Sequence, residues 1–172
     1  MQTCERRREI RPRDEKRLIL IRHAHRDTTD RGLDNGLSEK GILQADSLLK
    51  FYKWRFGKGS AVIVSSPKKR CVETIDPIAR ALDVTVQTQA HLMEQEKIET
   101  QRDFHKRVES FLDWWKLEGP ETTLVSSHGD WIPLAISQMV QAHIEVKKGA
   151  WIEVERVNGV ILLTWALQAI PL

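Results

Sequence analysis

The chain has 172 residues, of which 41% are apolar and 30% are charged. This is the size of one ordinary domain and the composition of a soluble globular protein. These values exclude a disordered chain and a TIM barrel, which needs about 250 residues. The longest apolar stretch, residues 160–167, is interrupted by Thr164 and is far shorter than the ~20 residues of a membrane-spanning helix.

The net charge of +3 comes from the N-terminal tail, because residues 5–17 hold seven basic and four acidic residues and the rest of the chain is balanced. That balance argues against a nucleic-acid-binding face, although a small arginine cluster inside a cleft stays open. Cys4 and Cys71 make neither a disulfide framework nor a CxxC metal motif. The N-terminus lacks the apolar segment of a secretory signal, so we expect a cytoplasmic protein. We interpret residues 1–16 as an irregular charged tail and residues 17–172 as a single α/β domain.

The first half of the chain predicts strands that alternate with helices. Continuous apolar and β-branched runs are typical of strands buried on both faces of a parallel sheet. Such runs occur at residues 18–21 and 61–64, with a weaker one at 84–86. A loop over residues 24–37 separates the first strand from a helix, for which Ser38 is the expected N-cap.

Apolar residues at helical spacing predict a second helix over residues 72–82. Asp76 is a capping residue type, and Pro77 suits the first position of a helix. Because an internal proline removes one helical hydrogen bond, we expect a break or a kink at Pro77.

The second half predicts two more helices, one strand and a hairpin. Asn158-Gly159 between two apolar runs is the strongest short-range signal for a hairpin. Alternating strands and helices form right-handed βαβ units. We therefore expect a three-layer α/β sandwich, in which helices cover both faces of a mostly parallel sheet and the hairpin adds an antiparallel edge. The expected elements are helices around residues 104–115 and 131–140, a strand at 123–125, and hairpin strands at 151–157 and 160–167.

Polar residues follow each predicted parallel strand, where open α/β sheets bind their ligands. Arg22 and His23 follow the first strand, and Arg70 lies shortly after the second. Glu94 follows the third strand, and His128 the fourth. Each has an ordinary structural explanation by itself, such as a solvated arginine or a hydrogen-bonded histidine at a strand end. Their shared position after apolar strands predicts one anion-binding site.

Three spaced motifs make this prediction more specific. They are Arg22-His23-Ala24, Ser66-Pro67-x-x-Arg70 with Glu73-Thr74, and Ser127-His128-Gly129. The segment Asn35-Gly36-Leu37-Ser38-Glu39-Lys40-Gly41, followed by Gln44-Ala45, adds a fourth match. Over roughly residues 18–141, these motifs resemble the histidine phosphatase superfamily, also called the phosphoglycerate mutase-like family.

The resemblance implies a metal-independent phosphatase without a cofactor. His23 would be the nucleophile that takes the phosphoryl group, while Arg22, Arg70 and His128 would hold the phosphate oxygens. Glu94 lies in the segment Leu92-Met93-Glu94 and would protonate the leaving oxygen. Water would then hydrolyse the phosphohistidine.

The physical chemistry of phosphoryl transfer fits these roles. The planar guanidinium of arginine matches the oxygens of a phosphoryl group, whose charge must be held in the transition state. Nearby cations also disfavour imidazolium, so His23 is expected to be neutral and able to attack near pH 7. The helix that begins near Trp131 is placed to direct its positive end at the anion. We name His25, Arg26 and Trp131 as candidate substrate contacts.

The segment after Glu94 bears on the substrate class. Only about ten residues separate Glu94 from the helix around Phe104, so the lid that larger members of the family carry is short or missing. This resembles the compact branch that includes protein phosphohistidine phosphatases. An open site suits a phosphoprotein, whereas an acid such as Glu94 suits phosphomonoesters. The expected partner is thus a phosphorylated small molecule or a phosphoprotein, and neither nucleic acid nor a membrane.

Two other interpretations stay open at this point. The pattern His23-x-His25-x-Asp27 is one that metal-dependent hydrolases use, because histidine and aspartate are suitable zinc ligands. This reading leaves Arg22 and Arg70 without a role. The second alternative is a protein that binds a phosphorylated ligand without turning it over.

Overall fold

The computed structural model describes residues 15–30 and 32–170. The predicted irregular tail lies outside these ranges except for its last two residues, and Lys16 already belongs to the first strand. The division into a tail and a single domain therefore stays a prediction. In chain order, the elements are β1 (Lys16–Arg22), α1 (Glu39–Phe56), β2 (Val62–Ser65), α2 (Lys69–Leu82), β3 (Gln87–Thr88), the short 3-10 helix η1 (Ala90–Leu92), α3 (Gln101–Leu117), β4 (Thr122–Ser127), α4 (Trp131–Val140), β5 (Trp151–Val157) and β6 (Val160–Leu167).

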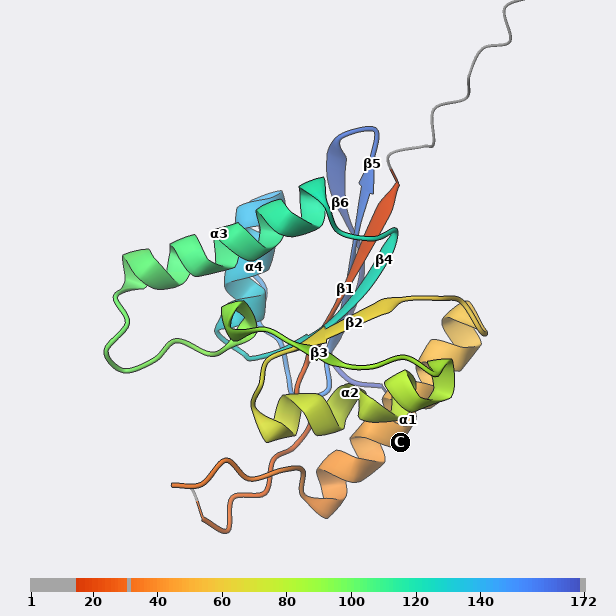
Figure 1. Ribbon diagram of the computed structural model, residues 1–172, viewed down its shortest axis with the longest axis vertical. Coiled ribbons are helices and arrows are strands. Elements are labelled where there is room, and N and C mark those ends of the chain that lie inside the picture. The colour runs from red at the N-terminus through yellow and green to blue at the C-terminus, as the bar shows by residue number, and fades with distance from the viewer. Residues whose placement is uncertain (1–14, 31, 171–172) are drawn as a thin grey trace, which may run out of the picture.

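The strands form one mixed sheet in the order β3-β2-β4-β1-β5-β6. The pairs among β1 to β4 are parallel, whereas β5 runs antiparallel to both β1 and β6. In Figure 1, α3 and α4 lie on one side of the sheet and α1 and α2 on the other. The predicted three-layer sandwich with an antiparallel edge hairpin is confirmed.

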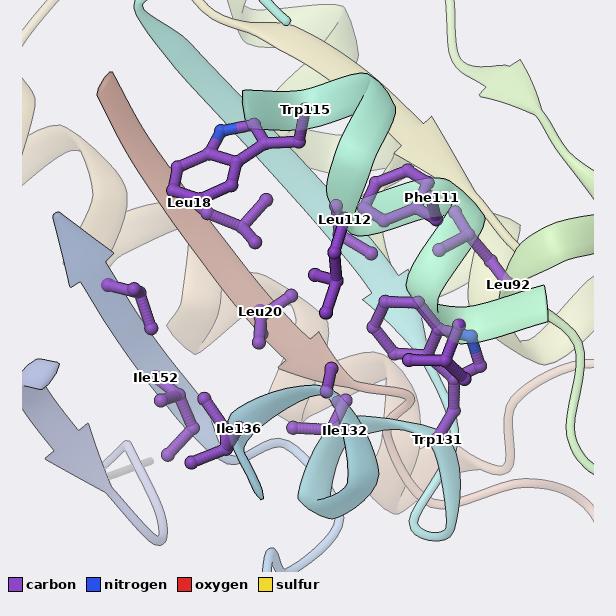
Figure 2. Packing of buried hydrophobic residues seen from close by; sticks show 14 of the residues in the cluster. Leu18, Leu20, Leu92, Phe111, Leu112, Trp115, Trp131, Ile132, Ile136 and Ile152 are labelled. Atoms are coloured by element: carbon purple, nitrogen blue, oxygen red, sulfur yellow. The ribbon is translucent and has the colours of Figure 1, made fainter. Parts of the chain in front are cut away.

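Strand β1 is apolar without interruption because it supplies side chains to two cores. Leu18 and Leu20 join the cluster under α3 and α4, in which Ile136 is also buried. Figure 2 shows this cluster. Ile19 and Ile21 point to the opposite face and join the cluster under α1 and α2. A strand that alternates its side chains between two buried faces needs an apolar residue at every position.

The beginning of α1 and the turn of the hairpin match the sequence signals. The Ser38 side chain accepts a hydrogen bond from the Gly41 backbone N–H and caps the helix. Asn158 and Gly159 have φ values of 52° and 80°, as a two-residue turn with positive φ at both positions requires. Within the described part of the chain, no helix combines the length and the apolar character needed to cross a bilayer.

Of the break or kink expected at Pro77, the break is wrong, and the kink stays a prediction. Helix α2 runs from Lys69 to Leu82 with Pro77 in its interior. Proline costs the helix one hydrogen bond, but Ile75, Ile78 and Ala79 are buried on both sides of it. Because burying one large aliphatic side chain contributes about 1.5–3 kcal/mol, packing on the sheet outweighs the lost bond.

The third strand is shorter and later than expected. β3 consists of Gln87 and Thr88, which pair with β2, and residues 84–86 lie in the connection that follows α2. Val86 nevertheless packs against the core under α1 and α2. Its apolar character reflects this packing and not a place in the hydrogen-bonded ladder.

Ile136 and Ile98 provide a matched pair for a test of this packing. The side chain of Ile136 is fully buried, whereas that of Ile98 is 92% exposed. We predict that Ile136→Ala lowers the free energy of unfolding by about 2–5 kcal/mol, because it removes buried methyl groups and leaves a cavity. Ile98→Ala should change it by less than about 0.5 kcal/mol. Urea denaturation of both variants measures the two values, and equal losses would contradict the described core.

Candidate active site

The carboxyl ends of β1 and β4 bring two histidines together. The strands pair in register, with Arg22 opposite Ser127, and the next residue on each strand is a histidine. The ring centroids of His23 and His128 are 5.4 Å apart. A hydrogen bond of 2.9 Å from the His23 backbone N–H to the Ser127 carbonyl extends the strand pairing to this point. The register of one strand pair thus creates the centre of the candidate site.

A hydrogen bond to the next residue orients the His23 side chain. Its Nδ1 lies 2.8 Å from the Ala24 carbonyl oxygen. Because a carbonyl oxygen can only accept, Nδ1 carries the proton in the neutral ring, and the lone pair lies on Nε2. Burial lowers the pKa of His23 to about 4, and the charges of Arg70, Arg22 and Lys148 act in the same direction. His23 is therefore neutral near pH 7 and has a free Nε2.

His128 is almost completely enclosed, with 1% of its surface exposed. Its Nε2 lies 2.8 Å from the Ser66 hydroxyl, and its Nδ1 lies 3.4 Å from Arg70 Nη2. Arginine can only donate, so Nδ1 accepts and Nε2 carries the proton toward Ser66. Burial, followed by the charge of Arg70, lowers the pKa of His128 to about 2. The free site thus holds two neutral histidines.

Arg22 enters the site from the end of β1. Its Nη1 donates to the Val146 carbonyl oxygen at 2.6 Å, which fixes the side chain across the backbone of Gly129. A Cβ atom at Gly129 would lie 2.6 Å from Arg22 Cζ, so only glycine leaves room for the guanidinium. The buried Nε of Arg22 has no hydrogen-bond partner among the described residues. Burial lowers the pKa of Arg22, and Asp130 partly compensates.

Arg70 approaches from the first turn of α2. Its Nη2 donates to Glu94 Oε1 at 2.6 Å, and its Nη1 lies 3.6 Å from Asp34 Oδ1. The Nε of Arg70, like that of Arg22, is buried without a partner in the described part of the chain. Buried donors without partners are costly and uncommon. Two such donors beside two neutral histidines form a site suited to an oxyanion.

Glu94 lies at the mouth of the site, with 43% of its side chain exposed. One carboxylate oxygen binds Arg70, and the other lies 3.7 Å from His128 Nδ1. The structure thus brings together all five residues that the sequence assigns to the chemistry. Glu94 thus contacts Arg70 and remains open to solvent.

Arg107 of α3 fastens the segment that carries Glu94. Its Nη1 donates to the carbonyl oxygens of Ala90, His91 and Met93 at 2.9–3.2 Å. Its Nη2 donates to the Glu94 carbonyl at 3.2 Å. The same guanidinium is also hydrogen-bonded to the Glu99 carboxylate. One side chain therefore organises the short connection between β3 and α3.

His25 lies beside the site and is hydrogen-bonded to the residue that caps α1. Its Nδ1 lies 2.9 Å from the Ser38 hydroxyl, and its backbone N–H donates to Gln44 Oε1 at 2.8 Å. The backbone of Arg26 pairs with that of Leu37 in an isolated antiparallel β-bridge. Burial and the charge of Lys148 lower the pKa of His25. His25 and Arg26 thus lie at the rim of the site, and their contact with substrate stays a prediction.

The prediction that Trp131 contacts substrate is wrong. Trp131 is fully buried, its indole N–H donates to the His91 carbonyl at 2.7 Å, and its ring packs on Phe111 (Figure 2). The helix N-terminus at Trp131 is not open to an anion either. Asp130 Oδ1 already accepts from the Trp131 backbone N–H at 2.8 Å.

The alternative metal pattern does not converge in space. His25 is bonded to Ser38, and Asp27 accepts from the backbone and hydroxyl of Thr29 within its own turn. Across residues 15–30 and 32–170, no three His, Cys, Asp or Glu side chains are grouped so as to hold a metal ion. These hydrogen bonds give His25 and Asp27 structural roles.

Three contributors to the site were not predicted as such. Ser66 lies inside a quoted motif, but its bond to His128 depends on the adjacency of β2 and β4. Arg107 lies thirteen residues beyond Glu94, and no sequence signal marks it. Lys148 comes from the loop before β5, and only the packing of that loop on Arg22 brings it here.

Comparison with known proteins agrees with this geometry. The family model of the histidine phosphatase superfamily (branch 1) matches residues 18–97. No curated protein sequence matches the chain.

Solved structures share the fold across almost the whole chain. A protein from Escherichia coli, provisionally described as an alpha-ribazole-5'-P phosphatase, has a TM-score of 0.75 at 22% identity, covering 91% of this chain and 98% of that one. A phosphoserine phosphatase mutant from Entamoeba histolytica, in complex with phosphoserine, has a TM-score of 0.72 at 20% identity and covers 88% and 96%. The alpha-ribazole phosphatase from Shigella flexneri has a TM-score of 0.72 at 19% identity and covers 91% and 98%.

At these identities the structural likeness establishes the fold, and the family match adds the segment that holds His23, Arg70 and Glu94. Over residues 18–97 the chain is similar to the histidine phosphatase superfamily, and across almost its whole length it shares its fold with solved structures of phosphatases.

Proposed function

We propose that this protein hydrolyses phosphomonoesters through a covalent phosphohistidine on His23, without a metal ion. One observation carries the proposal. The guanidinium groups of Arg22 and Arg70, each with a buried Nε that has no partner among the described residues, lie beside a neutral His23 whose Nε2 is free. This combination offers donors for phosphate oxygens and a nucleophile in one place.

In the first step, His23 Nε2 attacks the phosphorus atom and the ester P–O bond breaks. Arg22, Arg70 and His128 hold the oxygens that carry charge in the transition state. The protonated carboxyl of Glu94 gives its proton to the leaving oxygen, so the alcohol departs neutral. The Ala24 carbonyl stabilises the charge on the phosphorylated ring, because it keeps the proton on Nδ1.

In the second step, a water molecule attacks the phosphohistidine and the P–N bond breaks. The Glu94 carboxylate, now deprotonated, accepts a proton from this water. Inorganic phosphate leaves, and His23 returns to its neutral form. The exposure of Glu94 supports this double role, because the same carboxylate must meet first the alcohol and then water.

The substrate class follows from the mouth of the site. Only residues 95–100 separate Glu94 from α3, which supports the compact, short-lid type of site that the sequence suggests. An acid at Glu94 favours esters, whose alkoxide needs a proton, over phosphohistidine substrates. We therefore favour a phosphorylated small molecule over a phosphoprotein, and we place the reaction in the cytoplasm.

A His23→Ala exchange tests the nucleophile. We predict that p-nitrophenyl phosphate hydrolysis by the wild type persists in excess EDTA, and that His23→Ala lowers kcat about 10³-fold or more. The physical reason is that no other side chain offers a lone pair at this position. A colorimetric assay measures both values.

His143→Ala provides the matched control, because His143 is an exposed histidine with no assigned role in the site. It should retain wild-type activity. Loss of wild-type turnover in EDTA, with recovery on added metal, would contradict the proposal. So would a His23→Ala enzyme that remains active.

The protonation of His23 provides a pH test. Folded His23 has a pKa of about 4, against 6.5 for an ordinary histidine. The unfolded chain therefore binds more protons between these pH values, and this contribution to stability is lost as the pH falls from 6.5 towards 4. An NMR titration of the free protein should give a midpoint near pH 4. Arg70→Gln should raise it, because a nearby positive charge is removed.

Arg80→Gln is the control for this titration, because Arg80 lies on the same helix but pairs with Asp76 at an exposed position. It should leave the midpoint of His23 unchanged. A midpoint near 6.5 in the wild type would contradict the buried, cation-flanked environment.

The role of Arg107 makes a prediction about leaving groups. Arg107→Gln removes most of the hydrogen bonds that hold the Glu94 segment, so delivery of the proton should suffer. We expect kcat for an alkyl phosphate to fall about tenfold or more, whereas kcat for p-nitrophenyl phosphate falls less, because nitrophenolate departs without full protonation. Arg102→Gln, an exposed arginine on the same helix, should change neither value. An equal fall for both esters would assign Arg107 a purely structural role.

A further inference from the structure

A group of cations outside the phosphate-binding set surrounds the mouth of the site. We call Arg26, Lys40 and Lys148 the cationic rim. The Gln44 carboxamide links two of the segments that carry the rim. Its Oε1 accepts from the His25 backbone N–H at 2.8 Å, and its Nε2 donates to the Lys148 carbonyl oxygen at 3.3 Å. The loops that carry Arg26 and Lys148 thus meet at the two ends of one amide group.

The loop of Lys148 also packs directly on the strand that ends in the nucleophile. The Gly149 backbone N–H donates to the Arg22 carbonyl at 3.1 Å, and Arg22 Nη1 donates to the Val146 carbonyl at 2.6 Å. Lys40 lies in the first turn of α1, two residues after the Ser38 cap. The rim is therefore continuous with the site around His23.

The rim carries positive charge that the protein does not neutralise. In the described ranges, none of its three side chains lies within ion-pair distance of a carboxylate. Arg70 differs, because Asp34 and Glu94 face it. Burial lowers the pKa of Lys148, and the neighbouring charges of Arg22, Arg26, Lys40 and Arg70 lower it further. An ordinary solvated surface intersperses both signs of charge, whereas the neighbouring charges that act on Lys148 are all positive.

Unpaired like charges repel each other and favour a bound counter-anion. Arg22 and Arg70 already match the oxygens of one phosphoryl group. Resting on the phosphatase function proposed above, we infer that the cationic rim binds a second negatively charged group, so that the substrate is a phosphomonoester whose alcohol portion carries a carboxylate or a further phosphate.

Binding of two matched phosphonates tests the rim without turnover. Propylphosphonate carries one anionic group, and 3-phosphonopropionate replaces its terminal methyl with a carboxylate. Calorimetry on the wild type should show the carboxylate analogue binding about tenfold or more tightly. Lys148→Gln should remove most of this advantage, because it deletes the rim cation whose loop is hydrogen-bonded to Arg22.

Lys147→Gln is the matched control, since it removes the same charge from the neighbouring exposed residue. It should preserve the advantage of the carboxylate analogue. Equal affinities of the two phosphonates for the wild type would overturn the inference. An equal loss in both lysine variants would also overturn it, because the carboxylate would then be attracted by the overall positive charge of the protein and not by the rim.

Turnover of the corresponding esters separates this inference from the proposed function. The wild type should give a higher kcat/KM for 3-phosphooxypropanoate than for propyl phosphate, and Lys148→Gln should reduce that ratio towards one. A ratio of one in the wild type overturns the rim alone. If neither ester is hydrolysed while the phosphonate preference persists, the proposed function fails and the rim stands. If neither phosphonate binds, both are wrong.

Discussion

The placement of two arginines whose buried Nε groups have no partner among the described residues is the constraint on which the site depends. Arg22 donates a hydrogen bond to the Val146 carbonyl oxygen and occupies the space that a side chain at position 129 would fill. Arg70 is held by Glu94 and Asp34. Their charges, added to burial, keep both histidines neutral. The same arrangement that favours His23 as a nucleophile also places cationic donors beside it, and we interpret this as preorganisation for phosphate.

Most of the fold could be predicted because β1 is apolar at every position and strands alternate with helices. The errors occurred where tertiary packing overrides local preference. Pro77 remains inside α2 because burial on both sides of it outweighs one hydrogen bond. β3 lies at Gln87 and Thr88, later than predicted, because a strand is defined by backbone pairing with β2. An apolar pattern indicates only which side chains are buried.

The site could be predicted to the extent that its residues directly follow strands. The β1–β4 register alone brings His23 next to His128. Trp131 was predicted to contact substrate because it lies three residues after His128. In the structure it is the first residue of α4, and its side chain is buried in the core. Arg107 and Lys148 could not be found in this way, because their roles arise from contacts between elements that are distant along the chain.

The central claim is a covalent bond between phosphorus and His23 Nε2. Its most direct test is to quench the wild-type enzyme in alkali during turnover and to locate the phosphorylated peptide by mass spectrometry, since a phosphoramidate survives base and is lost in acid. The account predicts a phosphoryl group on the peptide that contains His23, localised to that histidine. Steady turnover without a phosphorylated peptide, or with the phosphoryl group on another residue, would contradict it.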